Sequence, residues 1–199
     1  PIVFARGSHH AIGQQIGEAM RSQVRHGIEN VRSYLDAHSA RLNLSWSQAI
    51  PPAMQYMHHT AATYPQYIDE IMGIAEGANV TYPDRVVVNT LECLVFDALH
   101  IEKCTSIAAS KQETLNGGVL VGHNEDWLSV DEQDVYILDC HPLDEPAFLA
   151  ISYGSLLPNI GFNSAGIAQC CNSVNPLDVK FGIPRIILSR AILAASTLQ

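Results

Sequence analysis

Apolar residues recur at spacings of three or four over the first part of the chain, a pattern that is typical of amphipathic helices. The longest series predicts one long helix and consists of Ile12, Ile16, Met20, Val24, Ile28, Val31 and Leu35. A second helix should begin near Pro65 and end at Gly77, and the residues that it turns inward should be Ile68, Ile71, Met72 and Ala75.

The segment that starts with Thr81-Tyr-Pro-Asp has the capping residue and early proline of a helix start. The apolar positions of this third predicted helix are Val87, Leu91, Leu94, Val95 and Ala98. The β-branched run Val86-Val87-Val88 favours a strand equally well. Both alternatives stay open at the level of the sequence.

The pattern changes after Lys103, where short apolar runs replace the helical spacing. Runs at 105–110 and 119–123 flank Asn116-Gly117-Gly118, and Asn-Gly between two such runs predicts a tight hairpin. Further strand-like runs occupy 135–140, 148–153 and 166–171, and a last helix should begin at Pro184. Helices followed by antiparallel-looking strands and one more helix indicate an α+β fold.

Composition narrows the classes of function. With 47% hydrophobic and 16% charged residues among 199, the chain is an ordinary globular protein, and its formal charge of −9 excludes nucleic acid as a partner, because phosphate binding needs basic patches. The apolar stretch 183–195 is broken by Arg185 and Arg190, so we expect no membrane span. Five cysteines without a disulfide pattern favour a reducing, cytoplasmic location.

Cys104 stands at the head of a predicted strand and behind a separable helical segment. This is the arrangement that an N-terminal-nucleophile enzyme needs, because cutting the peptide bond before the cysteine places a free amino group beside the thiol as its base. Such an amine titrates near neutral pH. Asp126, in the returning strand, could hold this amine, and Asn163 and Asn172 offer amide donors for a tetrahedral oxyanion.

Four segments together carry a resemblance to a known family: KCTSIAAS, NGGVLVGHNEDW, GFNSAGIAQCCN and, upstream, YPQYIDEIMGIAEGANV. They are similar, in the same order, to the acyl-coenzyme A:6-aminopenicillanic acid acyltransferases, also called isopenicillin N acyltransferases, which are cysteine-type N-terminal-nucleophile (Ntn) hydrolases. The resemblance implies a four-layer αββα sandwich. It also implies that 1–103 is a helical pro-segment and 104–199 is the first part of the catalytic domain, which we expect further chain to complete.

The resemblance assigns roles to individual residues. It implies that Cys104 is the nucleophile, freed by self-cleavage of the Lys103–Cys104 bond, that Asp126 holds the new amino group, and that Asn172 is the oxyanion-hole asparagine. His123 stands where relatives often have arginine or glutamine. We count His123, Trp127 and Asn163 as candidate substrate-binding residues.

The expected activity is cleavage or transfer of the acyl group of a small amide or acyl thioester through a thioester acyl-enzyme. These steps require no metal or organic cofactor. Hydrolysis and aminolysis differ only in the second nucleophile, so hydrolase and transferase both stay open, as does a homo-oligomer. The alternative from another class is an unprocessed, non-catalytic binding scaffold with the same fold.

Simpler interpretations exist for each of these residues. A lone cysteine is usually a buried core residue, Asp126 could cap a turn, and Asn172 could bond a neighbouring loop. The doublets His9-His10, His58-His59 and Cys170-Cys171 do not predict a metal site, because adjacent side chains point apart and none fits a known ligand spacing.

Overall fold

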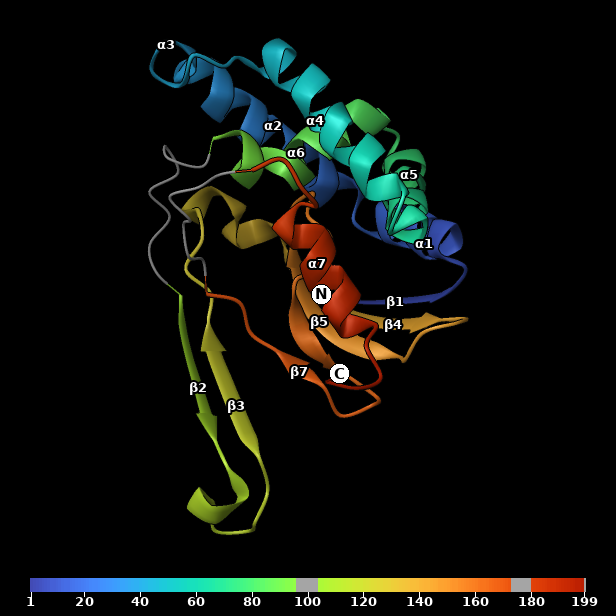
Figure 1. The fold of residues 1–199 in the computed structure, drawn as a ribbon. Helices are drawn as coiled ribbons and strands as arrows, with labels where there is room; N and C mark the ends of the chain where they lie inside the picture. Colours follow the sequence, from blue (N-terminus) through green and yellow to red (C-terminus); the bar gives the residue numbers. More distant parts are fainter. Residues whose placement is uncertain (96–103, 173–179, 199) are drawn as a thin grey trace.

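A computed structural model describes residues 1–95, 104–172 and 180–198 (Figure 1). Before residue 104 the elements are β1 (Ile2–Gly7), α1 (His9–Ala19), α2 (Arg21–Ala37), α3 (Ser39–Leu42), α4 (Trp46–Ala61), α5 (Pro65–Ala78) and α6 (Tyr82–Leu94). After it they are β2 (Thr105–Ala109), the 3-10 helix η1 (Lys111–Glu113), β3 (Leu120–Asn124), the 3-10 helix η2 (Ser129–Asp134), β4 (Val135–Pro142), β5 (Phe148–Tyr153), β6 (Ile160–Asn163), β7 (Ala168–Gln169) and α7 (Arg185–Leu193).

The predicted helices occur, with two corrections to their bounds. The single long helix is wrong, since the chain breaks at Met20 into α1 and α2. Helix α5 begins at Pro65 as expected but continues through Gly77 to Ala78, where Asn79 adopts the left-handed conformation that ends it.

The third predicted helix also forms, and its start is confirmed. The Thr81 hydroxyl accepts a hydrogen bond from the backbone N–H of Asp84, which satisfies one of the free donors of the first turn of α6. The three valines 86–88 lie within this helix, so the strand alternative is wrong. Its predicted apolar position Ala98 lies outside the described residues.

A five-stranded sheet has the order β1-β4-β5-β6-β7. Its β4 and β5 strands match the predicted runs, and they pair antiparallel, as do the later neighbours. The sequence pattern did not predict β1 or β6, and the run 166–171 forms only the two-residue strand β7. Strand β1 pairs in parallel with β4, with Ile2 opposite Ile137, so the first residues of the chain are part of the same sheet as the last strands.

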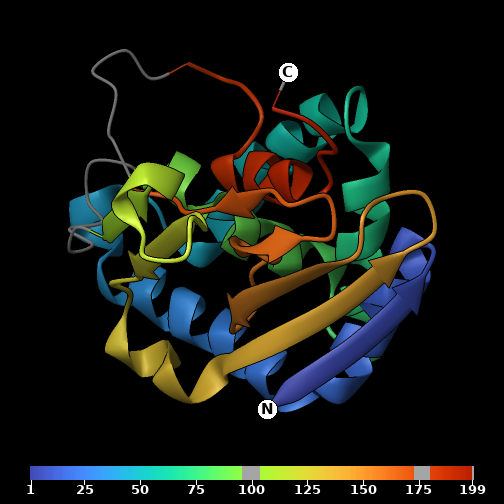
Figure 2. The same cartoon turned by 90° about the horizontal axis from the view of Figure 1, so that it is seen from below.

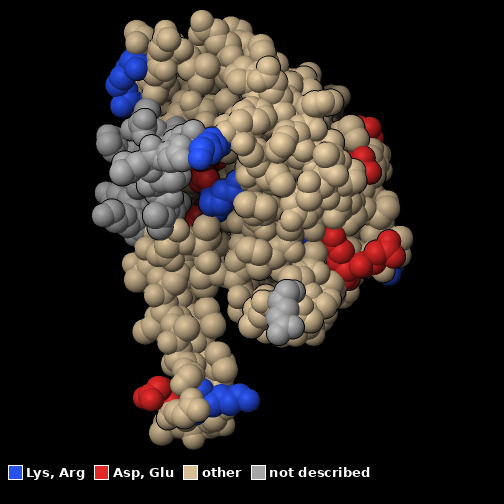
Figure 3. Space-filling view, viewed as in Figure 1, with Lys and Arg blue, Asp and Glu red and all other residues tan. Residues whose placement is uncertain are grey.

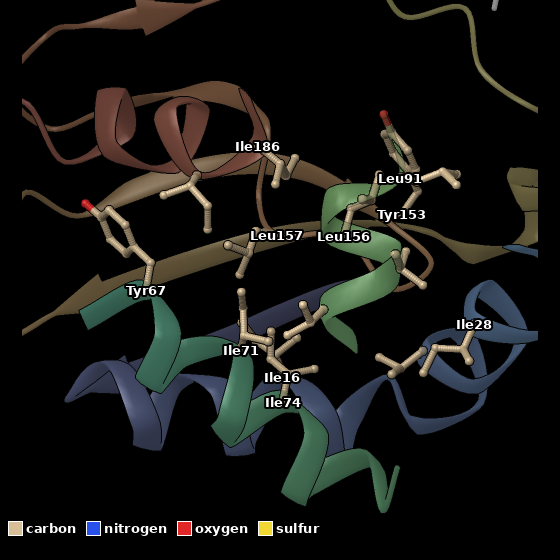
Figure 4. Close-up of a cluster of buried hydrophobic side chains, with 14 of the residues drawn as sticks. Ile16, Ile28, Tyr67, Ile71, Ile74, Leu91, Tyr153, Leu156, Leu157 and Ile186 are labelled. Atoms are coloured by element: carbon tan, nitrogen blue, oxygen red, sulfur yellow. The ribbon is translucent and has the colours of Figure 1, made fainter. Parts of the chain in front are cut away.

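One face of this sheet is covered by helices, and the core lies between them (Figures 1 and 4). Helix α7 and helices from the first half of the chain contribute to one buried cluster that includes Ile16, Ile71, Leu157 and Ile186. The helical segment before residue 104 is therefore packed into the same core as the strands that follow it.

Helices α1 and α5 approach each other unusually closely because both present glycines at a spacing of four. Gly13 and Gly17 lie against α5, and Gly73 and Gly77 lie against α1. A side-chain carbon at Gly73 would overlap the backbone carbonyl of His10. The glycine-rich stretch that ends α5 thus has a packing role.

The opposite face of the sheet is apolar and exposed. In Figure 2 this face is turned toward the viewer, and the helices lie behind it. Cross-strand neighbours on adjacent strands share this face, and its exposed apolar members are Ile2, Phe4, Val135, Ile137, Leu149, Ile151 and Phe162. A mixed helix and sheet architecture is thereby confirmed, whereas a second sheet that covers this face stays a prediction.

Strands β2 and β3 form a separate antiparallel hairpin that projects from the body (Figure 1). The predicted strands are confirmed, but the tight turn is wrong: residues 110–119 join them and include η1, with Gly117 at φ 66°. The paired strands of the hairpin carry almost no charged side chains on the face shown in Figure 3. Exposed apolar residues along the hairpin are Ile107, Leu115, Val119, Leu120 and Val121.

Buried ion pairs connect elements on both sides of residue 104. The Arg190 guanidinium of α7 contacts Glu70 of α5 at 3.1 Å and Glu145 at 3.1 Å, and the side chains of both Arg190 and Glu70 are 0% exposed. His9 of α1 contacts Glu70 at 2.9 Å and Glu145 at 3.3 Å. Such a network is favourable only when each charge keeps its partners. It therefore ties the first and last helices to one another.

None of the helices that the structure describes is at once long enough and apolar enough to cross a lipid bilayer.

Candidate active site

Cys104 lies directly before β2, at the base of the projecting hairpin. The register pairs Thr105 with Asn124 and Ser106 with His123. Extended by one residue, this register places Cys104 opposite Glu125, and the thiol Sγ donates to Glu125 Oε2 at 3.4 Å. Residues two apart on a strand share a face, so the two strands bring four polar side chains together: Cys104, Ser106, His123 and Glu125.

His123 links this group through both ring nitrogens. Its Nδ1 lies 2.8 Å from Ser106 Oγ, and its Nε2 lies 2.9 Å from Glu125 Oε2. The His123 side chain is only 6% exposed, although the hairpin beyond it projects into solvent. The second oxygen of Glu125, Oε1, accepts a hydrogen bond of 2.7 Å from the hydroxyl of Tyr153 at the end of β5. Hairpin and main sheet meet at this carboxylate.

Asn172 reaches the same group from the segment after β7. Its side-chain amide donates to the backbone carbonyl of Cys104, and its oxygen accepts from the Ser106 hydroxyl. An amide donor is therefore held within reach of the atoms around Cys104 by a second hydrogen bond that fixes its orientation. The structure brings together the predicted residues Cys104, His123 and Asn172.

Asp126 also adjoins the thiol, through its backbone. Burial raises the pKa of the Cys104 thiol, the hydrogen bond from the Asp126 backbone opposes this change, and the nearby Glu125 charge adds to it. The pKa of Cys104 lies above its ordinary value as a result. Because the thiolate is the nucleophile, this site needs a base to become reactive.

Trp127 lies beside this group and not within it. Its indole N–H donates to Asp131 Oδ2 at 2.7 Å, and its ring is 5.2 Å from the ring of Tyr153. Both rings line a small enclosed cavity of about 20 Å³ together with Arg185, which is room for about one water molecule. The ring of Trp127 thus forms part of the wall of this cavity, and Tyr153, whose hydroxyl binds Glu125, connects that wall to the base of the hairpin.

The Arg185 guanidinium extends this wall toward Asn172. It pairs with Glu92 of α6 at 2.7 Å and donates to the Cys171 sulfur at 3.3 Å. Figure 3 shows basic and acidic side chains next to one another near the base of the hairpin. Cys171, the residue before Asn172, therefore connects the segment that carries Asn172 to helix α7.

Asn163 lies apart from this group. It pairs with Phe148 at the start of β5, whereas Tyr153 is at the other end of that strand, roughly 17 Å away at about 3.4 Å per residue. Its amide nitrogen donates to the carbonyls of Leu193 and Ala195 at 3.0 and 2.7 Å. Asn163 thus joins β6 to the end of α7. The remaining predicted residue, Lys103, lies outside the described residues.

Sequence reasoning did not identify Glu125, Ser106 or Tyr153. The available signal was the alternation along each strand, since His123 and Glu125 share one face of β3, as Cys104 and Ser106 do at β2. The contact of Tyr153 with Glu125 had no such signal, because it depends on how the hairpin docks on the sheet.

Comparisons with known proteins find similarity to one family of enzymes. The family model for acyl-coenzyme A:6-aminopenicillanic acid acyl-transferase matches residues 113–199. The 40 kDa form of acyl-coenzyme A:6-aminopenicillanic-acid-acyltransferase from Emericella nidulans is 24% identical over 198 residues, which cover 98% of this chain and 53% of the relative.

A second relative comes from an animal. The beta-alanyl-dopamine/carcinine hydrolase of Drosophila melanogaster is 23% identical over 223 residues, which cover 100% of this chain and 55% of the relative. The chain spans about half the length of the curated relatives it matches. The family model matches the segment from the connection between β2 and β3 onward, and both relatives align along nearly the whole chain, so the chain is similar in sequence to the acyl-coenzyme A:6-aminopenicillanic acid acyltransferase family.

Proposed function

We propose that this chain is the core of a self-processing cysteine Ntn enzyme that cleaves or transfers the acyl group of a small amide or acyl thioester. The observation that carries the proposal is the position of Cys104 at the head of β2, with the Asn172 amide on its own carbonyl. The two relatives support the reaction class, since one is named as an acyltransferase and the other as a hydrolase.

Processing comes first. The Cys104 thiol attacks the carbonyl carbon of Lys103, the peptide bond to the Cys104 nitrogen breaks, and a thioester forms while the nitrogen gains a proton. Water then cleaves this thioester, which returns the thiol and leaves a carboxylate on Lys103. The product is a chain that begins with Cys104 and carries a free α-amino group, whose pKa near neutrality suits a general base.

Turnover uses the same sulfur. The amine takes the thiol proton, the thiolate attacks the substrate carbonyl, and the leaving amine or thiol receives that proton as the acyl group becomes a thioester on Cys104. Water or an amine acceptor then attacks this thioester and regenerates the thiol. The second nucleophile alone decides between hydrolysis and transfer.

The neighbours of Cys104 have distinct roles in this scheme. The Asn172 amide donates to the oxyanion of the tetrahedral intermediate, and the Asp126 carboxylate orients the new amino group. His123 and Glu125 are positioning residues, because they act through Ser106 and through the thiol itself. Trp127 stays a candidate substrate-binding residue, since its ring packs beside that of Tyr153, which binds Glu125.

The uncovered face of the five-stranded sheet supports the αββα sandwich that the family resemblance implies. Seven apolar side chains on that face are exposed, and an exposed apolar patch of this kind is typical of a surface that packs against another layer. The β2–β3 hairpin is a natural beginning of that layer, since a two-stranded hairpin has little stability alone. We infer that the catalytic domain continues this second sheet.

Intact mass spectrometry of the full-length protein under denaturing conditions tests the proposal. We expect two fragments that meet between Lys103 and Cys104 in the parent protein, and one uncut polypeptide in Cys104→Ala, which should also lose turnover of amides and thioesters. Cys170→Ala is the matched control, since that thiol has an intermediate exposure like Cys104, and it should process normally.

A single uncut chain in the parent protein would favour the binding-scaffold alternative, because the amine base would never form. Thiol alkylation at neutral pH further distinguishes a catalytic enzyme from a binding scaffold. An activated Cys104 should react faster than the other four cysteines, whereas uniform slow labelling would contradict catalysis.

A further inference from the structure

We propose that Cys104, His123 and Glu125 form a Zn²⁺ site that holds the thiol in an inactive state. The inhibitory part of this proposal rests on the proposed function, since it assumes that Cys104 is the nucleophile. The binding part depends only on three side chains at the base of the hairpin.

The ligand atoms already have nearly the required spacing. Sγ of Cys104, one ring nitrogen of His123 and one oxygen of Glu125 all lie within 4.8 Å of one another. Sγ is 3.4 Å and Nε2 is 2.9 Å from Glu125 Oε2. Ligands of a tetrahedral zinc ion are about 3.4–3.6 Å apart, given bond lengths of about 2.0–2.3 Å. Shifts on the order of 1 Å or less would admit the ion.

Two further residues orient these ligands in the manner of a metal site. The Ser106 hydroxyl lies 2.8 Å from His123 Nδ1 and donates to Asn172, so its oxygen can accept a hydrogen bond from Nδ1–H, which leaves Nε2 as the coordinating nitrogen. The Tyr153 hydroxyl donates to Glu125 Oε1 at 2.7 Å and leaves Oε2 to face the thiol. Metal-binding histidines and carboxylates characteristically have such outer hydrogen bonds.

The donor set selects the kind of ion. One thiolate, one imidazole and one carboxylate suit zinc, whereas Mg²⁺ and Ca²⁺ prefer oxygen ligands alone. Three protein ligands leave the fourth position to water. Binding releases the thiol proton and any proton shared between Nε2 and Oε2, because ligands coordinate in their deprotonated forms.

Coordination would also inhibit catalysis. Zinc takes one lone pair of the thiolate, withdraws negative charge from the sulfur and occupies the space beside it, so the sulfur becomes a much weaker nucleophile toward a carbonyl carbon. The ion would therefore inhibit both processing and turnover until it is removed. Spacing along the sequence could not predict this group, since Cys104 precedes β2 whereas His123 and Glu125 stand at the end of β3.

The test is a Co²⁺ titration of the full-length protein after treatment with a chelator. We expect a sulfur-to-cobalt charge-transfer band and the visible bands of tetrahedral Co²⁺ at one equivalent, both displaced by Zn²⁺. Cys104→Ser should abolish the charge-transfer band, and His123→Ala and Glu125→Gln should each weaken binding by about 10-fold or more. Ser106→Ala, which keeps all three ligands, should weaken it by about 10–100-fold.

His141→Ala is the matched control. His141 lies on a strand two residues after a carboxylate, Asp139, at 2.9 Å, as His123 lies two residues before Glu125, but the described structure places no thiol with that pair. This variant should bind Co²⁺ as the parent does. Circular dichroism of each variant separates loss of a ligand from loss of the fold.

Binding and activity are measured separately. A charge-transfer band that is unchanged in Cys104→Ser, or absent from the parent, would overturn the site whether or not the enzyme is active. A band that depends on all three ligands establishes the site even in a protein that cleaves no amide, and in that case the proposed function fails alone. In an active enzyme, turnover that saturating Zn²⁺ does not reduce would overturn the inhibitory role.

Discussion

Deprotonation of His9 should destabilise the fold, because its ring carries a positive charge between two acidic side chains. Burial disfavours the charged ring, but hydrogen bonds to Glu145 and Glu70 and their charges outweigh this effect and raise the pKa of His9 from 6.5 to about 9. The ring is 16% exposed, and its Nδ1 and Nε2 lie 2.9 Å from Glu70 and 3.3 Å from Glu145. Alkaline pH therefore removes a buried cation from this network.

The direction and magnitude of the change in stability with pH follow from the pKa values of His9 in the unfolded and folded states. Because the pKa in the folded state is the higher one, the stabilisation is fully present below pH 6.5 and is lost as the pH rises through 9. The difference, 9 − 6.5 = 2.5 units, corresponds to about 3 kcal/mol at about 1.4 kcal/mol per unit. For a domain of this size, each kcal/mol shifts Tm by about 2–4 °C. We expect Tm to fall by about 6–12 °C over this window.

Neighbouring groups that face His9 hold their own protons across this range. Burial raises the pKa of Tyr67, and the Glu70 and Glu145 charges hold the pKa of Arg190 above its ordinary value against the effect of burial. Both pKa values therefore lie above the window. The carboxyls of Glu70 and Glu145 have lowered pKa values despite burial, because Arg190 and His9 favour their charged forms. His9 is the group in this network that changes charge.

Thermal unfolding by circular dichroism at pH 6 and at pH 9.5 measures the effect. His9→Gln keeps a polar side chain without the charge, and it should lose most of the difference in Tm between the two values of pH. His10→Gln is the control, since that ring is 39% exposed and contacts only the exposed Glu76 at 3.3 Å among the ion pairs that the structure describes. Equal pH dependence in His9→Gln and the parent protein would refute this reasoning.

Two further predictions concern packing. Arg190→Met should destabilise the protein by about 3–5 kcal/mol, because it leaves the buried Glu70 charge with His9 as its remaining partner. The control Arg41→Met changes an exposed arginine and should alter the free energy of unfolding by less than about 0.5 kcal/mol. Urea denaturation measures both variants, and equal losses would contradict the importance of the buried ion pair. Gly73→Ala should cost about 2 kcal/mol or more, since the added carbon overlaps the His10 carbonyl, while Gly182→Ala, with open space around it, should be neutral in the same assay.

The sequence pattern correctly predicted those helices and strands whose formation depends on residues close together in the sequence. Strands β4 and β5 alternate buried and exposed residues along most of their length, and Thr81 caps α6 within four residues of sequence. Strand β1 escaped prediction because its partner β4 is more than a hundred residues away and because parallel pairing leaves no local signal. Helix α4 contains Pro51 and Pro52, which ordinarily interrupt a helix. Here the buried face of that helix outweighs their effect.

In the candidate site, too, the sequence indicated what depends on local pattern and missed what depends on distant contacts. Cys104 was chosen as the candidate nucleophile because its position at the start of a strand has a chemical meaning, and the structure brings Asn172 into contact with its carbonyl. Glu125 was not considered on sequence grounds, because only the register of β2 and β3 reveals that its side chain faces the thiol, and the role of Asp126 toward a new amino group stays a prediction. Asn163 looked like a free amide donor, and its use as a link between β6 and the end of α7 depends on tertiary packing alone.

The parallel pairing of β1 with β4 determines the molecularity of unfolding. In an uncut chain both strands belong to one polypeptide, and the unfolding midpoint does not depend on protein concentration. In a chain cut before Cys104 they belong to two polypeptides, so that loss of the sheet is also a dissociation. The midpoint then rises with concentration. Dilution would thus become a denaturing condition for a cut protein and not for an uncut one.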